Sequence, residues 1–321
     1  MEPFGYVAAS DEKMAIDESS RGMFIAGGTN MVDYMRLGVV RPTTIIDISR
    51  LPLTNVEDAG GGLKIGALVR NSDLAYHPLV QQRFPVLAEA LLSGASPQIR
   101  NMATTGGNIL QRTRCPYFRD THFSQCNKRD PGSGCAAISG FNRSHAILGT
   151  STMCIATNPS DMNVAMAALD AIVRVHGPKG ERDIAFVDLH TLPGEHPEIE
   201  TQLQPGELIT YVTIPPITGK QHYLKVRDRA SFAFALASAA VVLDVQGGTI
   251  KNARVALGGV ATKPWRSKEA EAMLVGQPPT PAVFDKAAGA ALGGAKGQPT
   301  NKFKLDLARR TIVRALMEVA K

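Results

Sequence analysis

The chain has 321 residues, of which 44% are hydrophobic and 20% are charged. This is the composition of an ordinary soluble globular protein, and the length predicts two or three domains. The net charge is +6, but Lys and Arg are spread along the chain, and only 6% of the residues are aromatic. Both features argue against a base-stacking nucleic-acid surface, so we expect no nucleic-acid partner.

The sequence carries no membrane signal. Residues 1–17 lack a basic segment followed by an apolar run, so no signal peptide is predicted. The longest apolar stretch, 232–243, is too short to span a bilayer. We therefore expect no membrane span. The protein would be cytoplasmic, or periplasmic if a partner with its own export signal carried it across the membrane.

Residues 1–55 predict a small α/β unit. Short apolar or β-branched runs indicate its strands, and polar segments between them indicate helices. The expected strands cover 4–8, 23–26 and 43–48, and the expected helices cover 11–19 and 31–37.

Residues 56–219 predict a second α/β unit. Asn71-Ser72-Asp73 and Ser160-Asp161 are typical helix starts, because their side chains can accept hydrogen bonds from free backbone amides. A longer helix is expected over 79–92. The expected strands cover 63–68, 146–156, 171–175, 183–187 and 207–214.

Residues 220–321 predict a separate α+β domain with an antiparallel sheet. Gly247-Gly248 indicates the turn of a hairpin between two apolar runs. The expected strands cover 223–226, 235–245 and 250–257, and the expected helices cover 267–274, 281–292 and 303–319.

Two glycine-rich turns are candidate anion sites. Gly27-Gly28-Thr29-Asn30 follows a predicted strand, and Thr104-Thr105-Gly106-Gly107-Asn108 has similar chemistry. Consecutive backbone amides in such turns can bind a phosphate. Neither turn matches the Rossmann or P-loop pattern, so tight structural turns are about as well supported as a shared diphosphate site.

All four cysteines, Cys115, Cys126, Cys135 and Cys154, lie in or at the exit of one irregular segment. In a long chain without a signal peptide, disulfides are the less favoured use. Four thiolates from one loop suit a tetrahedral zinc ion or an iron–sulfur cluster. The spacing lacks paired C-x2-C motifs, which slightly favours the cluster over zinc. His122 and His145 lie in the same segment as reserve ligands.

Taken together, these segments resemble the FAD-binding medium subunits of molybdenum hydroxylases, the family of the xanthine dehydrogenase and carbon monoxide dehydrogenase flavoproteins. The resemblance covers nearly the whole chain and is carried by five segments in order. The cysteine-containing loop looks like that of the FAD subunit of bacterial periplasmic aldehyde oxidoreductase. The five segments are 24–30, 104–108, 157–161, 205–209 and the strand around Lys225.

The resemblance implies a fold with a two-part α/β FAD-binding domain of the PCMH/vanillyl-alcohol-oxidase type and a C-terminal α+β domain. The parts would be residues 1–55, residues 56–219 with an iron–sulfur loop inserted at about 112–154, and residues 220–321.

The resemblance also implies a ligand set. The first glycine turn, with Thr104 and the Gly106-Gly107 backbone, would hold the FAD diphosphate, and Asp161 would accept hydrogen bonds from ribityl or ribose hydroxyls. The backbone of Ile209 would touch the flavin or adenine, and Lys225 would lie beside the isoalloxazine and favour its anionic reduced form. The four cysteines would ligate a [4Fe–4S] cluster. The implied FAD-binding residues are Met23, Phe24, Ile25, Ala26, Gly27, Gly28, Thr29, Asn30, Met31, Thr104, Thr105, Gly106, Gly107, Asn108, Asp161, Ile209 and Lys225.

The implied function is electron transfer within an aldehyde oxidoreductase, with no catalytic residue of its own on this subunit. A molybdenum-cofactor large subunit would oxidise the substrate, and a small [2Fe–2S] subunit would relay electrons to this FAD, in a heterotrimer or its dimer. An external acceptor would then take the electrons; because no dinucleotide fingerprint is present, NAD is not assigned. A zinc-stabilised basic binding module and a stand-alone flavin oxidase are the alternatives.

Overall fold

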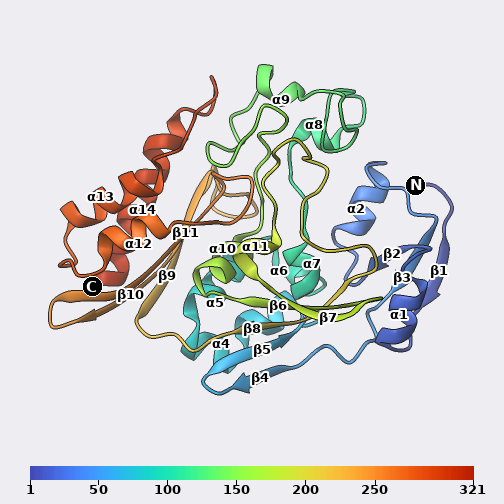
Figure 1. The fold of residues 1–321 in the computed structure, drawn as a ribbon, viewed down its shortest axis with the longest axis horizontal. Helices are drawn as coiled ribbons and strands as arrows, with labels where there is room; N and C mark the ends of the chain where they lie inside the picture. The colour runs from blue at the N-terminus through green and yellow to red at the C-terminus, as the bar shows by residue number, and fades with distance from the viewer.

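The computed structural model describes all 321 residues, from Met1 to Lys321. The strands form three sheets, and each sheet takes its strands from one continuous part of the chain (Figure 1). None of the helices combines the length and the apolar character needed to cross a membrane.

The first sheet is parallel, with the order β1-β3-β2. Its strands are β1 (Gly5–Ala8), β2 (Met23–Ile25) and β3 (Thr44–Asp47), joined by helices α1 (Glu12–Glu18) and α2 (Met31–Arg36). Asp11 begins α1, because its side chain accepts a hydrogen bond from the Met14 amide at 2.8 Å. Residues 5–47 therefore form three parallel strands with two connecting helices.

The second sheet is antiparallel, with the order β4-β5-β8-β6-β7. Its main core of 33 buried residues is filled largely by the sheet and by helices α5 and α10. The strands are β4 (Val56–Ala59), β5 (Gly62–Gly66), β6 (Ile172–Gly177), β7 (Gly180–Ala185) and β8 (Leu208–Ile214). The helices are α3 (Asn71–Tyr76), α4 (Pro78–Arg83), α5 (Pro85–Ser93), α6 (Pro97–Arg100), α7 (Thr105–Ile109), α8 (Pro116–Arg119), α9 (Ala136–Ser139), α10 (Asp161–Ala168) and α11 (Phe186–Leu189).

Several predictions for this unit were wrong in detail. The helix expected over 79–92 is divided between α4 and α5, because Pro85 lacks an amide donor and Phe84 before it leaves the helical region, at φ −133° and ψ 53°. The strand expected over 183–187 ends at Ala185, where α11 follows.

The strand expected over 146–156 does not form either. That segment makes only a one-residue bridge, between Leu148 and Ala261. Its apolar pattern has another cause, because Ile147 and Leu148 are buried in the core of the C-terminal domain. Strands β4 and β12, which are short or polar, were not predicted.

The third sheet is antiparallel, with the order β12-β11-β10-β9. Helices α12, α13 and α14 cover one face, and the other face packs on α5 and α10 of the preceding unit (Figure 1). The strands are β9 (Lys220–Val226), β10 (Ala237–Gln246), β11 (Thr249–Gly258) and β12 (Trp265–Arg266), and the helices are α12 (Lys268–Leu274), α13 (Pro281–Ala291) and α14 (Phe303–Ala320).

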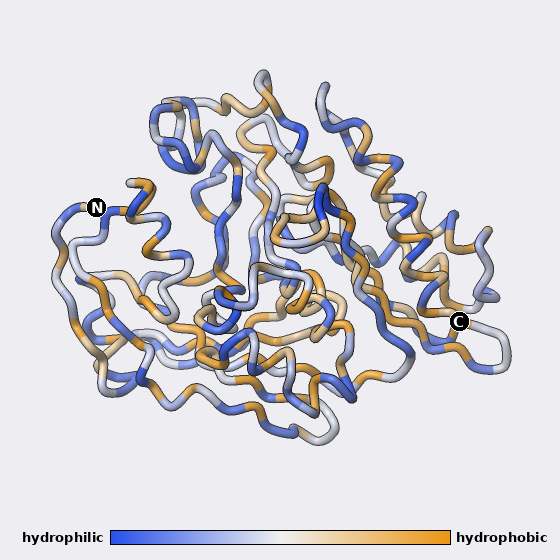
Figure 2. The backbone as a smooth tube through the Cα atoms, turned by 180° about the vertical axis from the view of Figure 1, so that it is seen from behind, coloured by the Kyte–Doolittle hydropathy of each residue, from blue (hydrophilic) through white to orange (hydrophobic).

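The packing explains the hydropathy of these strands. Residues 237–243 of β10 are all buried, so this stretch is apolar except for Ser238 and its hydropathy does not alternate. Figure 2 shows hydrophobic stretches along the strands, whereas the loop that carries α8 and α9 has long hydrophilic stretches. Gly247 and Gly248, with φ of +59° and +73°, form the predicted hairpin turn, which favours glycine because both residues have positive φ.

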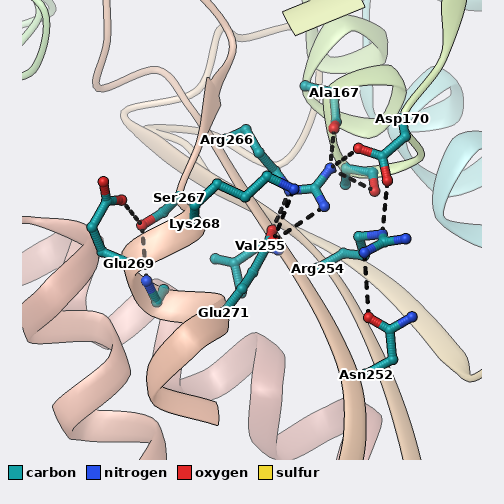
Figure 3. Close-up of polar contacts among 12 residues, drawn as sticks. Ala167, Asp170, Asn252, Arg254, Val255, Arg266, Ser267, Lys268, Glu269 and Glu271 are labelled. Atoms are coloured by element: carbon teal, nitrogen blue, oxygen red, sulfur yellow. Dashed lines mark hydrogen bonds and ion pairs between the residues drawn. The ribbon is translucent and has the colours of Figure 1, made fainter. Parts of the chain in front are cut away.

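A buried ionic network joins the C-terminal domain to the end of α10 (Figure 3). The guanidinium of Arg266, on β12, donates hydrogen bonds to the carbonyl of Ala167 at 2.6 Å and to Asp170 Oδ1 at 2.8 Å. It also pairs with Glu271, and its side chain is only 4% exposed. Arg266 therefore satisfies the free carbonyls at the C-terminus of α10, where a cation is favoured.

Candidate functional site

Three of the segments that were singled out in the sequence meet at one place. The side-chain amide of Asn30 donates a hydrogen bond to the Gly107 carbonyl at 2.9 Å, which joins the two glycine turns. The Ser160 hydroxyl donates to Asn108 Oδ1 at 2.9 Å, which joins the second turn to the start of α10. Gly27 lies so close to the second turn that a Cβ on it would be 1.8 Å from the Met102 carbonyl oxygen. Only glycine fits that approach.

The first glycine turn has free backbone donors. None of the backbone amides of residues 26–30 donates to a backbone carbonyl. Gly28 has a φ of +73°, a left-handed conformation that favours glycine. Consecutive amides beside a left-handed residue form a concave anion site, so the turn fits a phosphate or diphosphate group.

The second glycine turn differs from this arrangement. The amides of Thr105 and Gly106 donate to the carbonyls of Val69 and Ala67, at 2.9 and 2.8 Å. The Gly107 amide donates to the Thr104 hydroxyl at 3.3 Å, as part of the cap of α7. The second turn therefore positions the first one, and its own amides from Thr105 to Gly107 are already satisfied within the chain.

A cavity of about 770 Å³ opens beside these turns. Its size is typical of a cofactor site. Its walls combine apolar side chains of α5 and of residues 232–236 with polar groups from both domains. Five of the predicted residues line it: Thr29, Asn30, Asn108, Asp161 and Lys225.

Asp161, at the start of α10, is held by two groups of β9. Its carboxylate accepts hydrogen bonds from the Tyr223 hydroxyl at 2.6 Å and from the Lys225 ammonium at 2.8 Å. The Lys225 and Asp161 side chains are 4% and 7% exposed. Burial raises the pKa of Tyr223 well above its ordinary value, and the Asp161 charge adds to the rise, so Tyr223 remains a donor. Because residues 223 and 225 point to the same face of β9, both reach the carboxylate.

A cluster of arginines forms another part of the cavity wall. Asp33 on α2 pairs with Arg119 at 2.7 Å and Arg114 at 3.2 Å. Burial raises the pKa of Asp33, but the hydrogen bonds and charges of the two arginines outweigh it and hold the pKa below the ordinary value. Arg114 also donates to Asn30 Oδ1 at 3.2 Å. These cations make this wall favourable for an anionic ligand.

The remaining predicted residues do not line the cavity, and several lining residues were not predicted. Ile209 is buried in β8, within the main core and paired with Val175. Met23, Phe24, Ile25, Ala26, Gly27, Gly28, Met31, Thr104, Thr105, Gly106 and Gly107 are absent from its walls, although most belong to the two turns beside it. The sequence did not predict three lining residues, Asp33, Arg114 and Arg119. It also did not predict Tyr223, which donates a hydrogen bond to the lining residue Asp161.

The four cysteines gather in the loop of residues 112–154, which we call the cysteine loop. Cys126 and Cys135 face each other in an antiparallel bridge. Cys126 and Cys154 are buried, and all four thiols are free of disulfides. The Asn127 side chain donates to the Met153 carbonyl at 3.0 Å, which holds the bridge beside Cys154.

The thiols influence one another. Burial raises the pKa of Cys115 to about 12; amides of Phe118 and Tyr117 oppose this rise, and Cys154 and Cys126 add to it. Burial also raises the pKa of Cys154, where the Lys128 charge opposes the rise and Cys135 and Cys126 add to it. The thiolate forms of Cys115 and Cys154 are therefore disfavoured unless a positive centre stabilises them.

The cysteine loop does not hold a preformed site for a single ion. No group of three or more His, Cys, Asp or Glu side chains is arranged to bind one metal ion. A tetrahedral zinc would need its four sulfurs within about 4 Å of one another, because each Zn–S bond is about 2.3 Å. A [4Fe–4S] cluster binds each thiolate through a different iron and holds the sulfurs farther apart.

His122 and His145 occupy different surroundings in the cysteine loop. The His122 side chain is 96% exposed and pairs with Asp120. His145 is buried, and its Nε2 lies 3.1 Å from Cys115 Sγ. Burial, together with the Lys304 charge, lowers the pKa of His145 to about 4, so the ring is neutral at pH 7.

The free amides of the first glycine turn and the cavity beside it are features of a protein that binds a phosphate-containing cofactor. Residues 4–217 match the family model described as the FAD binding domain in molybdopterin dehydrogenase. Residues 222–319 match that of the CO dehydrogenase flavoprotein C-terminal domain. The chain therefore belongs to the family of FAD-binding flavoprotein subunits of the molybdenum hydroxylases, which are oxidoreductases, and the family resemblance is confirmed.

Particular relatives narrow this description. The chain is 54% identical over 301 residues to the aldehyde oxidoreductase FAD-binding subunit PaoB of Escherichia coli (strain K12), covering 92% of this chain and 90% of that protein. It is 28% identical over 265 residues to the carbon monoxide dehydrogenase medium chain of Afipia carboxidovorans, covering 82% of this chain and 75% of that one. The solved carbon monoxide dehydrogenase of Hydrogenophaga pseudoflava matches with a TM-score of 0.77 and 27% identity, over 99% of this chain and 98% of that one.

Proposed function

We propose that this chain is the FAD- and [4Fe–4S]-binding electron-transfer subunit of a molybdenum-containing aldehyde oxidoreductase. The observation that carries the proposal is the 54% identity with the aldehyde oxidoreductase subunit PaoB over 92% of the chain. The 28% identical relatives include one named for a different substrate, the carbon monoxide dehydrogenase medium chain of Afipia carboxidovorans. The higher identity favours an aldehyde as the substrate of the complex.

For FAD, the free amides of residues 26–30 support a role of the first turn in binding the diphosphate. Bound FAD supplies the redox chemistry, and the protein supplies binding, orientation and electrostatics. Asp161 and Lys225 form one wall of the cavity as an ion pair, so each fixes the other in orientation. Arg114 and Arg119 also line the cavity and add positive charge to it. The division into residues 1–55, 56–219 and 220–321 belongs to the same proposal.

For the cluster, Cys115, Cys126, Cys135 and Cys154 are the proposed ligands. Their support is chemical: four free thiols share one loop, and neighbouring cysteines add to the raised pKa values of Cys115 and Cys154. Ligation would also order a hydrophilic loop that has little core of its own.

The proposed partners follow from the relatives, several of which are medium chains or subunits of complexes. A large subunit with a molybdenum cofactor would oxidise the aldehyde, and a small [2Fe–2S] subunit would deliver electrons to this chain. An external acceptor would then take them.

The test is an analysis of the purified chain under anaerobic conditions. We expect denaturation to release about one FAD per chain, and iron analysis to give about four irons, with an EPR signal on reduction. Iron-free protein containing FAD would refute the cluster alone, and flavin-free protein would refute the site. Bleaching of the flavin by aldehyde without any partner would instead support a stand-alone oxidase.

A further inference from the structure

His145 is a buried side chain to which the proposed function gives no role. Its Nε2 lies 3.1 Å from Cys115 Sγ, and its Nδ1 is buried without a hydrogen-bond partner. Its backbone carbonyl accepts from the Asn301 side chain at 3.2 Å, so the residue is held from the C-terminal domain. The ring is therefore fixed against one particular cysteine.

The chemistry of the pair determines the direction of the hydrogen bond. A thiolate that ligates a metal can only accept, so the ring nitrogen that faces it must carry the hydrogen. The neutral tautomer with hydrogen on Nε2 leaves Nδ1 as a bare acceptor. That tautomer agrees with the burial of Nδ1 without a partner, because it leaves no N–H unsatisfied.

Cys115 also lies on the side of the cysteine loop that is close to the cavity of about 770 Å³. Cys115 and His145 line a smaller cavity of about 130 Å³. That cavity shares lining residues with the large one, among them Arg114, Pro159 and Asp161. The neighbouring residue Arg114 contacts Asn30 and Asp33 in the wall of the large cavity.

We propose that His145 is a positioning residue that donates a hydrogen bond from Nε2 to the Cys115 sulfur and would raise the reduction potential of the proposed cluster. This inference rests on the proposed function. A bound cluster would gain one negative charge on reduction, and the N–H of His145 directed at the Cys115 sulfur would stabilise that charge. Hydrogen bonds to the sulfurs are among the factors that set such potentials.

The experiment compares three variants of the full chain by iron content, FAD content and an EPR-monitored redox titration. His145→Leu removes the donor, His145→Gln keeps an N–H at a similar reach, and His122→Leu is a control in the same loop with an exposed side chain. We expect His145→Leu to keep iron and FAD but to shift the cluster potential to more negative values. His145→Gln should lie near the wild-type potential, and His122→Leu should match it.

Each outcome decides the proposal. An unchanged potential in iron-loaded His145→Leu would overturn it, as would an equal negative shift in His145→Gln. If His145→Leu loses iron, His145→Gln decides: full iron with the wild-type potential supports the donor role, and loss of iron there too overturns it in favour of packing or ligation by the ring. Iron-free wild-type protein would overturn both this inference and the proposed cluster.

Discussion

Replacement of Lys225 by Met tests the buried ion pair in the wall of the cavity. Lys225 and Asp161 are 4% and 7% exposed and lie 2.8 Å apart, so the substitution leaves a carboxylate almost without water. Removing one partner of a buried pair costs about 3–5 kcal/mol. We therefore expect Lys225→Met to lower the free energy of unfolding by about that amount, measured by urea unfolding followed by circular dichroism with FAD in excess.

A double variant separates the charge from the packing. In Lys225→Met with Asp161→Asn, the amide is neutral and can still accept from the Tyr223 hydroxyl, so the double variant should be more stable than Lys225→Met alone. The exposed pair of Lys13 and Asp17 provides the control, since Lys13→Met should cause no measurable change. A loss below about 1 kcal/mol in Lys225→Met, or no recovery in the double variant, would refute the reasoning.

Three further predictions concern other contacts of the same framework. Burial lowers the pKa of Lys304 to about 7 from 10.5, so between these pH values the unfolded chain holds a proton that the folded chain lacks. The free energy of unfolding should rise with pH across that range by at most roughly 5 kcal/mol. Lys304→Met should flatten this rise when thermal unfolding is followed from pH 6.5 to pH 9.5. Equal pH dependence in the wild type and the variant would contradict this. Gly27→Ala should destabilise the fold by about 1–3 kcal/mol and reduce retained FAD, because its Cβ would meet the Met102 carbonyl. As a control, the Cβ of Gly289→Ala in α13 meets no other atom, so this variant should be neutral or stabilising. Equal losses of stability in the two variants would contradict this. Arg266→Met should cost about 3–5 kcal/mol in urea unfolding, since it leaves Glu271 and Asp170 without their buried partner; a surface-like effect would contradict this.

Local chemistry made much of the fold predictable. Asp11, Ser160 and Ser267 were recognisable helix starts, and each side chain accepts a hydrogen bond from an amide in the first turn of its helix. The hairpin at Gly247-Gly248 followed from the two glycines. Segment 146–156 was mispredicted because an apolar run indicates burial but does not say against what, and here its partner is a domain that begins about 70 residues later.

Residues of the site were predictable only where a single segment of the sequence contains the complete pattern. The turn at 27–30 and the four cysteines were visible as local patterns. Arg114 and Asp33 were missed because an isolated arginine or aspartate has no distinctive spacing, and their meeting depends on a contact across 81 residues. Tyr223 could have been found, since it lies two positions before Lys225 on the same face of a strand. Ile209 was assigned to the site by resemblance alone, whereas its local sequence, within the strand expected over 207–214, agrees with the burial in the core that the structure shows.

The C-terminal domain contacts both ends of α10, which explains why the cavity needs both domains. The N-terminal end of α10 carries Asp161, which β9 holds through Lys225, and the C-terminal end is capped by Arg266 of β12. Strands β9 and β12 are the two outer strands of one four-stranded sheet. Such a sheet is about 14 Å from first to last strand, and the eight residues of α10 span about 12 Å. The helix thus crosses the sheet from edge to edge with an ionic contact at each end. The orientation of the cavity carboxylate is therefore determined by the C-terminal sheet as much as by the domain in which Asp161 lies.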